Sequence, residues 1–169
     1  MSWFRPLALL AVALLAACGF QPIHGGAHGV ETRAELAAVR VDPIEERIGQ
    51  MLRNHLLDTM NPAGTPERPA YRLIVTLNEA KSELGVRRTE IATRANLMLN
   101  ASYRLVRQAD GAQVFQGGSN ITASYNILNN DYATLAAEAD ARARSVRELS
   151  DDITQRVAAF FRQQAQAAR

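Results

Sequence analysis

Three segments between residues 71 and 127 alternate apolar and polar side chains, and no other feature of this 169-residue chain limits its fold as strongly. Successive side chains of a β-strand point to opposite faces, so such alternation indicates strands that each bury one face only. The apolar sets are Tyr71, Leu73, Val75 and Leu77; Leu97, Leu99, Ala101, Tyr103 and Leu105; and Phe115, Ile121, Ala123, Tyr125 and Ile127. Asp110-Gly111 marks a tight hairpin, and Gly117-Gly118 is interpreted as a bulge. The sequence therefore predicts a three-strand meander.

The chain before the meander predicts a short strand and a capped helix. The strand is expected at residues 36–41. Asp42, Pro43 and Glu45 then supply an N-cap, a favoured first helical residue and a capping-box partner. The apolar side of the helix is traced by Ile44, Ile48, Met51, Leu52, His55, Leu56 and Thr59. We expect the helix to end before Asn61-Pro62, where turn-forming residues begin.

A second, longer helix is predicted after Asn129-Asn130-Asp131. Its apolar stripe consists of Leu135, Ala139, Val146, Leu149, Ile153, Val157 and Phe160. The pattern covers about thirty residues, so a break near Asp140 or Ser145 stays open. The element order β-α-β-β-β-α predicts an α+β fold: a two-layer sandwich with two helices packed on one face of a four-stranded mixed sheet.

The amino-terminal end has the pattern of an exported lipoprotein. Arg5 precedes an unbroken apolar run, residues 7–17, which is too short to span a bilayer and is typical of a secretory signal peptide. Cys18, the only cysteine, follows Leu15-Ala16-Ala17, and this sequence is similar to the bacterial lipobox, where the thiol is acylated. Each buried CH₂ group contributes about 0.8 kcal/mol, so two or three acyl chains hold a domain on a membrane.

These features predict three parts of the chain. Residues 1–17 are expected to be a lipoprotein signal peptide, residues 18–35 a lipidated amino terminus and tether, and residues 36–165 a single α+β domain. The formal net charge of the chain is +2, and removal of residues 1–17 with Arg5 leaves +1, which argues against a nucleic-acid-binding protein, since such a protein needs a basic surplus. With its one cysteine acylated, an exported domain of this kind has no internal disulfide and depends on its hydrophobic core.

No catalytic residue, metal site or cofactor is predicted. His24 and His28 lie in the tether without a third ligand, and His55 lies on the apolar side of the first helix. No serine stands in a nucleophile-elbow sequence, and glycine-rich phosphate loops are absent from the sequence. The chain is therefore not expected to be an enzyme, and a lipid-anchored periplasmic hydrolase is kept only as a remote alternative.

The polar side of the predicted sheet is the first candidate binding site. Its candidate contact residues are Asn96, Asn100, Ser102, Asn120, Thr122, Ser124 and Asn126. A face that meets only solvent more often carries Lys, Glu and Arg. Amides and hydroxyls interrupted by apolar residues such as Met98 instead suit contact with a polar, partly dry surface. A plain solvent-facing sheet remains the alternative interpretation.

The second candidate is Arg87-Arg88, in the connection between the first two strands of the meander. Two adjacent guanidinium groups match the geometry of phosphates and carboxylates. Charged residues that only keep a loop soluble remain the alternative.

The amino-terminal residues also carry a family resemblance. Cys18-Gly19-Phe20-Gln21-Pro22-Ile23-His24-Gly25 resembles the Cys-Gly-Phe-x-Pro-Leu-Tyr/His-Gly motif of the LPS-assembly lipoproteins, the LptE family, in its alphaproteobacterial form. The body of the chain is similar as well, through Asn100-Ala101-Ser102-Tyr103-Arg104-Leu105, Ser124-Tyr125-Asn126 and Asp131-Tyr132-Ala133.

This resemblance implies a non-enzymatic outer-membrane lipoprotein that faces the periplasm. Members of the family plug the LptD β-barrel, assist its assembly and help insert lipopolysaccharide into the outer leaflet. The implied partners are the LptD barrel, lipopolysaccharide and the outer membrane. Basic residues near the connection that contains Arg87 and Arg88 contact lipopolysaccharide in the family, so these two are the candidate contacts here. An accessory lipoprotein of another envelope transport complex is the alternative function.

Overall fold

The computed structural model describes residues 27–84 and 94–167. The chain divides into two compact units, Met1–Glu31 and Thr32–Arg169, and the second unit contains the sheet and the long helices. The predicted signal peptide, Cys18, Arg87 and Arg88 lie outside the described residues.

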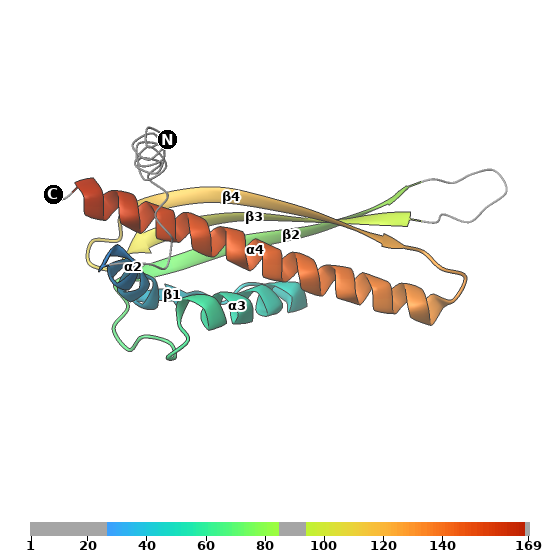
Figure 1. Cartoon of the computed structure of the whole chain (residues 1–169), viewed down its shortest axis with the longest axis horizontal. Helices are drawn as coiled ribbons and strands as arrows, with labels where there is room; N and C mark the ends of the chain where they lie inside the picture. The colour runs from blue at the N-terminus through green and yellow to red at the C-terminus, as the bar shows by residue number, and fades with distance from the viewer. Residues whose placement is uncertain (1–26, 85–93, 168–169) are drawn as a thin grey trace, which may run out of the picture. The chain divides into compact units, whose positions relative to one another are not determined.

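A four-stranded mixed sheet forms one layer of the fold (Figure 1). Its strands, in spatial order, are β1 (Val39–Val41), β2 (Tyr71–Leu84), β3 (Arg94–Arg107) and β4 (Gln113–Asn126). β1 pairs with β2 in parallel, whereas β2–β3 and β3–β4 are antiparallel. Every second residue of β3 from Ala95 to Leu105 is buried, as the alternation predicted. The three-strand meander is therefore confirmed.

Two helices form the second layer. Helix α3 (Glu46–Met60) packs on β1 and on α4 (Asp131–Ala167), and α4 crosses β3 and β4 (Figure 1). The main core lies between the layers and includes Leu52, Leu56, Leu73, Leu105 and Ile153, all fully enclosed. The predicted α+β sandwich with two helices on one face of the sheet is confirmed. Among the described residues, no helix has the length and apolar character needed to span a membrane.

Helix α2 (Ala27–Ala37) was not predicted from the sequence. Its apolar residues do not form a continuous stripe, which is why residues 27–35 were assigned to the tether. The helix also takes the first residues of the predicted strand 36–41, so β1 begins only at Val39. Leu36, near the end of α2, is buried in the main core.

Helix α3 begins later than the capping signal predicted. The backbone N–H of Asp42 donates to the carbonyl oxygen of Leu73 at 3.0 Å, which continues the β1–β2 pairing and removes Asp42 from the cap position. The helix starts at Glu46 instead, where φ is +65°, and Glu45 takes the N-cap position without a side-chain cap bond. The end of the helix at Met60 agrees with the prediction.

Helix α4 runs without a break from Asp131 to Ala167, which answers the question left open by its length. The second half of the predicted stripe is confirmed, since Val146, Leu149, Ile153 and Val157 are buried. The first half is wrong: Leu135 is 66% exposed, and Ala139 is exposed as well. The first turns pack through Ala137 and Ala141 instead, against Ala95, Leu97 and Tyr125.

The predicted bulge at Gly117-Gly118 is also wrong. Both glycines pair in register, Gly117 with Tyr103 and Gly118 with Ser102. The irregularity in the β3–β4 pairing lies between Leu105 and Val106, close to the hairpin.

Candidate functional site: the outer face of the sheet

The face of the sheet opposite α3 and α4 is called the outer face here, and it carries the predicted polar residues. Strand register brings them together in rows across the sheet. Asn78, Asn100 and Asn120 form one row, and Asn96 pairs with Ser124 in another. Of the seven predicted contact residues, Asn96 is half-buried and the others are exposed: Asn100, Ser102, Asn120, Thr122, Ser124 and Asn126. The structure thus places all seven on one surface.

Most hydrogen-bonding groups of this surface stay available to a partner. Ser124 Oγ donates to Asn96 Oδ1 at 2.7 Å. Within the described part of the chain, Asn100 and Asn120 have no side-chain hydrogen bond to another residue. Their amides therefore offer donors and acceptors across a flat area without charge.

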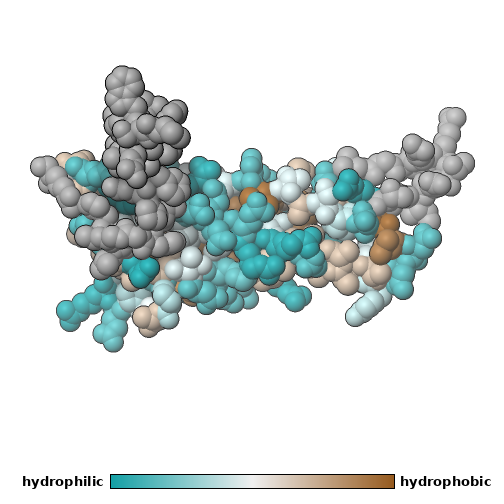
Figure 2. All heavy atoms as spheres, viewed as in Figure 1, coloured by the Kyte–Doolittle hydropathy of each residue, from teal (hydrophilic) through white to brown (hydrophobic). Residues whose placement is uncertain are grey.

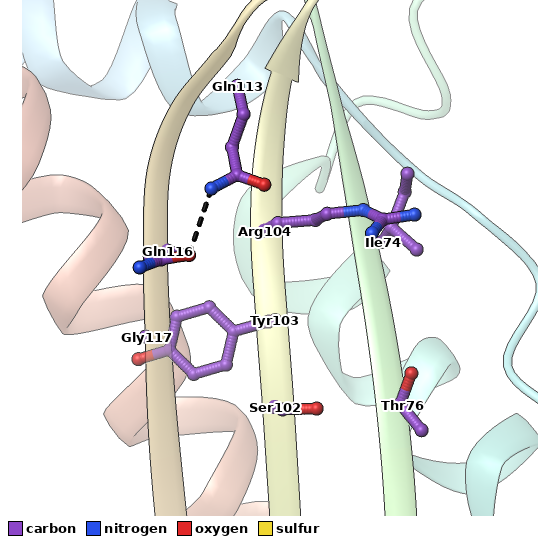
Figure 3. Close-up of a pocket in the computed structure, with 8 residues that line it drawn as sticks. All are labelled: Ile74, Thr76, Ser102, Tyr103, Arg104, Gln113, Gln116 and Gly117. Carbon is purple, nitrogen blue, oxygen red and sulfur yellow. Dashed lines mark hydrogen bonds between the residues drawn. The ribbon is translucent and has the colours of Figure 1, made fainter.

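A hollow of about 500 Å³ lies at one end of the outer face, near the β3–β4 hairpin (Figure 3). Gln113 Nε2 donates to Gln116 Oε1 at 2.9 Å along its rim. The side chain of Arg104 extends from β3 toward Ile74 on β2. The hollow therefore combines amides, one guanidinium group and an apolar side chain.

The inner face, toward the helices, contains an ion-pair network that the sequence did not reveal. Arg142 of α4 donates twice to Glu79 of β2, at 2.9 and 2.7 Å, and once to Glu138 at 2.8 Å. Lys81 Nζ and Tyr125 Oη donate to the other oxygen of Glu138 at 2.6 and 2.9 Å. Strand register places Glu79 on the inner face, opposite Leu99, and the packing of α4 brings Arg142 to it.

These contacts shift the pKa values of the side chains in the network. The hydrogen bond from Lys81 outweighs burial, and with those from Arg142 and Tyr125 it lowers the pKa of Glu138 to about 2. The hydrogen bond to Glu138 raises the pKa of Lys81, and burial raises the pKa of Tyr125. Glu138 is therefore a carboxylate held by three donors, which suits a structural tie between α4 and the sheet.

The network occupies the inner face where α3 no longer covers β2. A hollow of about 530 Å³ lies there between the first turn of α3 and α4, lined in part by Glu79, Lys81 and Arg142. Charged side chains are tolerated at this position because water reaches them and partners neutralise them.

A chain of polar groups links the sheet to the middle of α4. Ser119 Oγ donates to Asp152 Oδ2 and lies 3.5 Å from Tyr103 Oη, and Arg156 Nε donates to Asp152 at 2.8 Å. Burial alone raises the pKa of Asp152, but the bonds from Arg156 and Ser119 outweigh it and hold the pKa below its usual value. Such a carboxylate is a weak base for activating a serine. Across residues 27–84 and 94–167, no group of three His, Cys, Asp or Glu side chains is placed to hold a metal ion.

Exposed apolar side chains gather where α4 begins. Leu128, Tyr132 and Leu135 are 49%, 81% and 66% exposed. Figure 2 shows apolar atoms at the right of the view, where α4 begins, on a surface that is otherwise largely hydrophilic. The apolar stripe predicted for this helix includes Leu135, so the sequence does not predict this exposed patch.

Comparison with known proteins identifies a family. The family model described as LptE, lipopolysaccharide-assembly, matches residues 36–157. No curated protein sequence matches the chain.

Several solved structures share the fold. A Caulobacter crescentus protein described as a lipoprotein is 24% identical, with a TM-score of 0.67 over 78% of this chain and 96% of that one. A minor lipoprotein from Acinetobacter baumannii is 15% identical, with a TM-score of 0.59 over 72% and 90% of the two chains. The rare lipoprotein B from Shewanella oneidensis is 12% identical, with a TM-score of 0.58 over 78% and 98%.

Proposed function

This chain belongs to the LptE lipopolysaccharide-assembly family, and from that membership we propose that it is a lipid-anchored partner of the LptD outer-membrane β-barrel. In this role the domain binds and plugs the barrel, assists its assembly and thereby serves the insertion of lipopolysaccharide into the outer leaflet. The proposed role is binding and assembly rather than catalysis.

The uncharged rows in the middle of the outer face are the observation that carries this proposal. The interior of a large outer-membrane barrel is polar, and plugs occupy it. A flat surface with rows such as Asn78–Asn100–Asn120 offers hydrogen bonds to such a wall. These rows carry no charge that would have to lose its hydration when the partner covers them. An ordinary solvent-facing sheet has no need for this composition.

The anchor in this proposal is the acylated Cys18, which holds the mature chain on the periplasmic side of the outer membrane. Mass spectrometry of the mature protein tests this part. A cleaved amino terminus that begins with a triacylated or diacylated Cys18 supports it, and an unmodified cysteine contradicts it.

The proposed function is tested by isolating the full-length protein from detergent-solubilised outer membranes and identifying its partner by mass. A stable complex with the LptD barrel is expected, and depletion of the protein is expected to leave that barrel misassembled. A normal barrel and normal surface lipopolysaccharide after depletion would contradict the proposal. A stable complex with a different envelope transporter would instead support the alternative of an accessory lipoprotein.

Arg87 and Arg88 are proposed as lipopolysaccharide contacts. Changing both to alanine is expected to weaken the binding of lipopolysaccharide to the purified protein without changing its circular dichroism spectrum. The loss is expected to be largest at low salt, where charge–charge contacts are least screened. Equal affinity of the wild type and the double variant at low salt would reject this role.

A further inference from the structure

Three arginines lie side by side at one end of the outer face, on three neighbouring strands. Arg40 of β1 is the register partner of Arg72 of β2. Arg104 of β3 is the register partner of Ile74, which lies two residues from Arg72 on the same face. All three arginines are exposed. We call Arg40, Arg72 and Arg104 the arginine row.

This arrangement is unfavourable in the free protein. Like charges directly opposite each other on paired strands repel, and Arg40 lies opposite Arg72. Asp42 supplies one counter-charge, with its Oδ2 3.5 Å from Arg72 Nε. Within residues 27–84 and 94–167, neither Arg40 nor Arg104 takes part in an ion pair. The arginine row therefore holds more positive charge than its described surroundings neutralise.

The rows of the outer face next to the arginine row are uncharged and continue the same surface. The next rows, Thr76–Ser102–Gly118 and Asn78–Asn100–Asn120, contain no charged residue. The arginine row continues this same flat surface, because Arg104 extends across the sheet toward Ile74 beside the hollow (Figure 3). A partner that covers the uncharged rows therefore also reaches the arginine row. A guanidinium group enclosed without a counter-charge is strongly unfavourable.

We propose that the arginine row binds acidic side chains of the protein that covers the outer face. Aspartate or glutamate residues of that partner pair with Arg40 and Arg104 as Asp42 pairs with Arg72. Guanidinium groups accept such carboxylates in a two-point geometry, which fixes the position of the partner along the sheet. This inference rests on the proposed function. It adds that the barrel wall presents carboxylates where it faces the arginine row.

An anionic lipid surface is the competing occupant. A domain that binds lipid headgroups by charge presents a broad basic surface. Here three arginines lie at one end of the outer face and Arg94 lies at the other, with uncharged rows between them, and the formal net charge of the whole chain is only +2. These observations favour a protein partner whose carboxylates are equally localised.

The double variant Arg40→Glu/Arg104→Glu tests the inference in the full-length protein in its native membrane. Arg72 is kept because of its contact with Asp42. The matched control, Arg68→Glu/Arg147→Glu, makes the same change in charge at exposed residues outside the sheet. We expect the first variant to co-purify at least tenfold less LptD barrel than the wild type, and the control to co-purify a normal amount. If the glutamate variant does not fold, Arg40→Gln/Arg104→Gln replaces it, with an expected reduction of severalfold.

The partner at this end is identified by placing a photo-crosslinking residue at position 104. Crosslinked barrel peptides that contain aspartate or glutamate support the inference. Crosslinks to phospholipid alone would overturn it in favour of a lipid surface. Equal co-purification of the barrel by the wild type and the arginine variants would overturn it while leaving the proposed function intact. Failure of the wild type itself to co-purify any barrel would count against the proposed function.

Discussion

Gly117 is the residue on which the packing of the β3–β4 pair depends most directly. Tyr103 lies opposite it in register, and the tyrosine ring covers the glycine on the inner face. A Cβ atom at Gly117 would lie 2.6 Å from Tyr103 Oη and 2.7 Å from Cζ. At the neighbouring Gly118, a Cβ atom would make only an ordinary van der Waals contact, with the Ala101 carbonyl oxygen at 3.7 Å.

Two alanine substitutions at adjacent positions therefore have different expected effects. Gly117→Ala displaces the ring of Tyr103 and is expected to lower the free energy of unfolding by about 1–3 kcal/mol, the usual cost of overpacking. Gly118→Ala is the control and is expected to change it by less than about 0.5 kcal/mol. Urea unfolding of the purified domain measures both. Equal effects of the two substitutions would show that the ring contact is unimportant.

Glu138 links folding to pH at the residue scale. Its pKa of about 2 in the folded protein lies below its ordinary value of 4.5. A depressed pKa means that the carboxylate stabilises the fold above about pH 4.5 and that this stabilisation is lost as the pH falls toward 2. A shift of this size corresponds to about 3 kcal/mol.

The variant Glu138→Gln is expected to lack this pH-dependent contribution. Its deficit in the free energy of unfolding relative to the wild type is expected to be largest at pH 7 and to shrink as the pH falls toward 2. Glu148→Gln changes an exposed glutamate of the same helix and is the control. Denaturant unfolding at several pH values measures the difference. A deficit that stays constant from pH 7 to pH 2 would mean that the ion pairs of Glu138 do not carry the stabilisation.

At the scale of elements, α4 shows why apolar residues alone do not reveal a buried face. Its first turns approach the sheet through Ala137 and Ala141, whose small side chains permit close contact. Leu135, which is much more apolar, points away and is exposed. Sequence periodicity located the second half of the stripe correctly because large side chains from Val146 onward fill the space between the layers. Which residues are buried in the first half of α4 depends on the distance between the helix and the sheet. The local sequence does not determine that distance.

The buried side of α4 also contains hydroxyl groups without hydrogen-bond partners in the described part of the chain: Ser145, Ser150 and Thr154. Ser150 is almost fully enclosed, with 1% of its surface exposed. An enclosed hydroxyl without a partner is unfavourable, and alanine has the higher helix propensity. Ser150→Ala is therefore expected to raise the free energy of unfolding by about 0.5–1 kcal/mol. A thermal unfolding midpoint below that of the wild type would contradict this expectation.

At the scale of the whole molecule, the meander and its two faces were predictable, whereas the contacts between layers were not. Alternation along β3 determines which side chains share a face, because the side-chain period of a strand is two. The charged inner residues Glu79 and Lys81 follow the same alternation, yet their partners Glu138 and Arg142 lie far along the chain. Only the packing of α4 on the sheet brings them together. The arginine row likewise became visible only when the strand register was known.

The last prediction concerns a charge introduced on the outer face. Asn100 lies at the centre of the face, between Asn78 and Asn120 in register. Asn100→Glu places a carboxylate where no charged residue opposes it on either neighbouring strand, so the isolated domain is expected to fold with a free energy of unfolding within about 0.5 kcal/mol of the wild type. In the barrel complex the same carboxylate loses its hydration without a partner, at a cost of several kcal/mol.

Asn100→Glu is therefore expected to abolish co-purification of the LptD barrel while the domain stays folded. Asn54→Glu, at an exposed position of α3, makes the same chemical change on the helix layer and is the control. Co-purification from solubilised outer membranes, together with circular dichroism of both variants, measures binding and folding separately. If both variants retain the barrel, neither Asn100 nor Asn54 lies in the contact surface, and the assignment of the barrel contact to the middle of the outer face is contradicted. If both lose it, the whole domain is enclosed and the charge of either layer is excluded. Only loss with Asn100→Glu alone assigns the contact to the sheet.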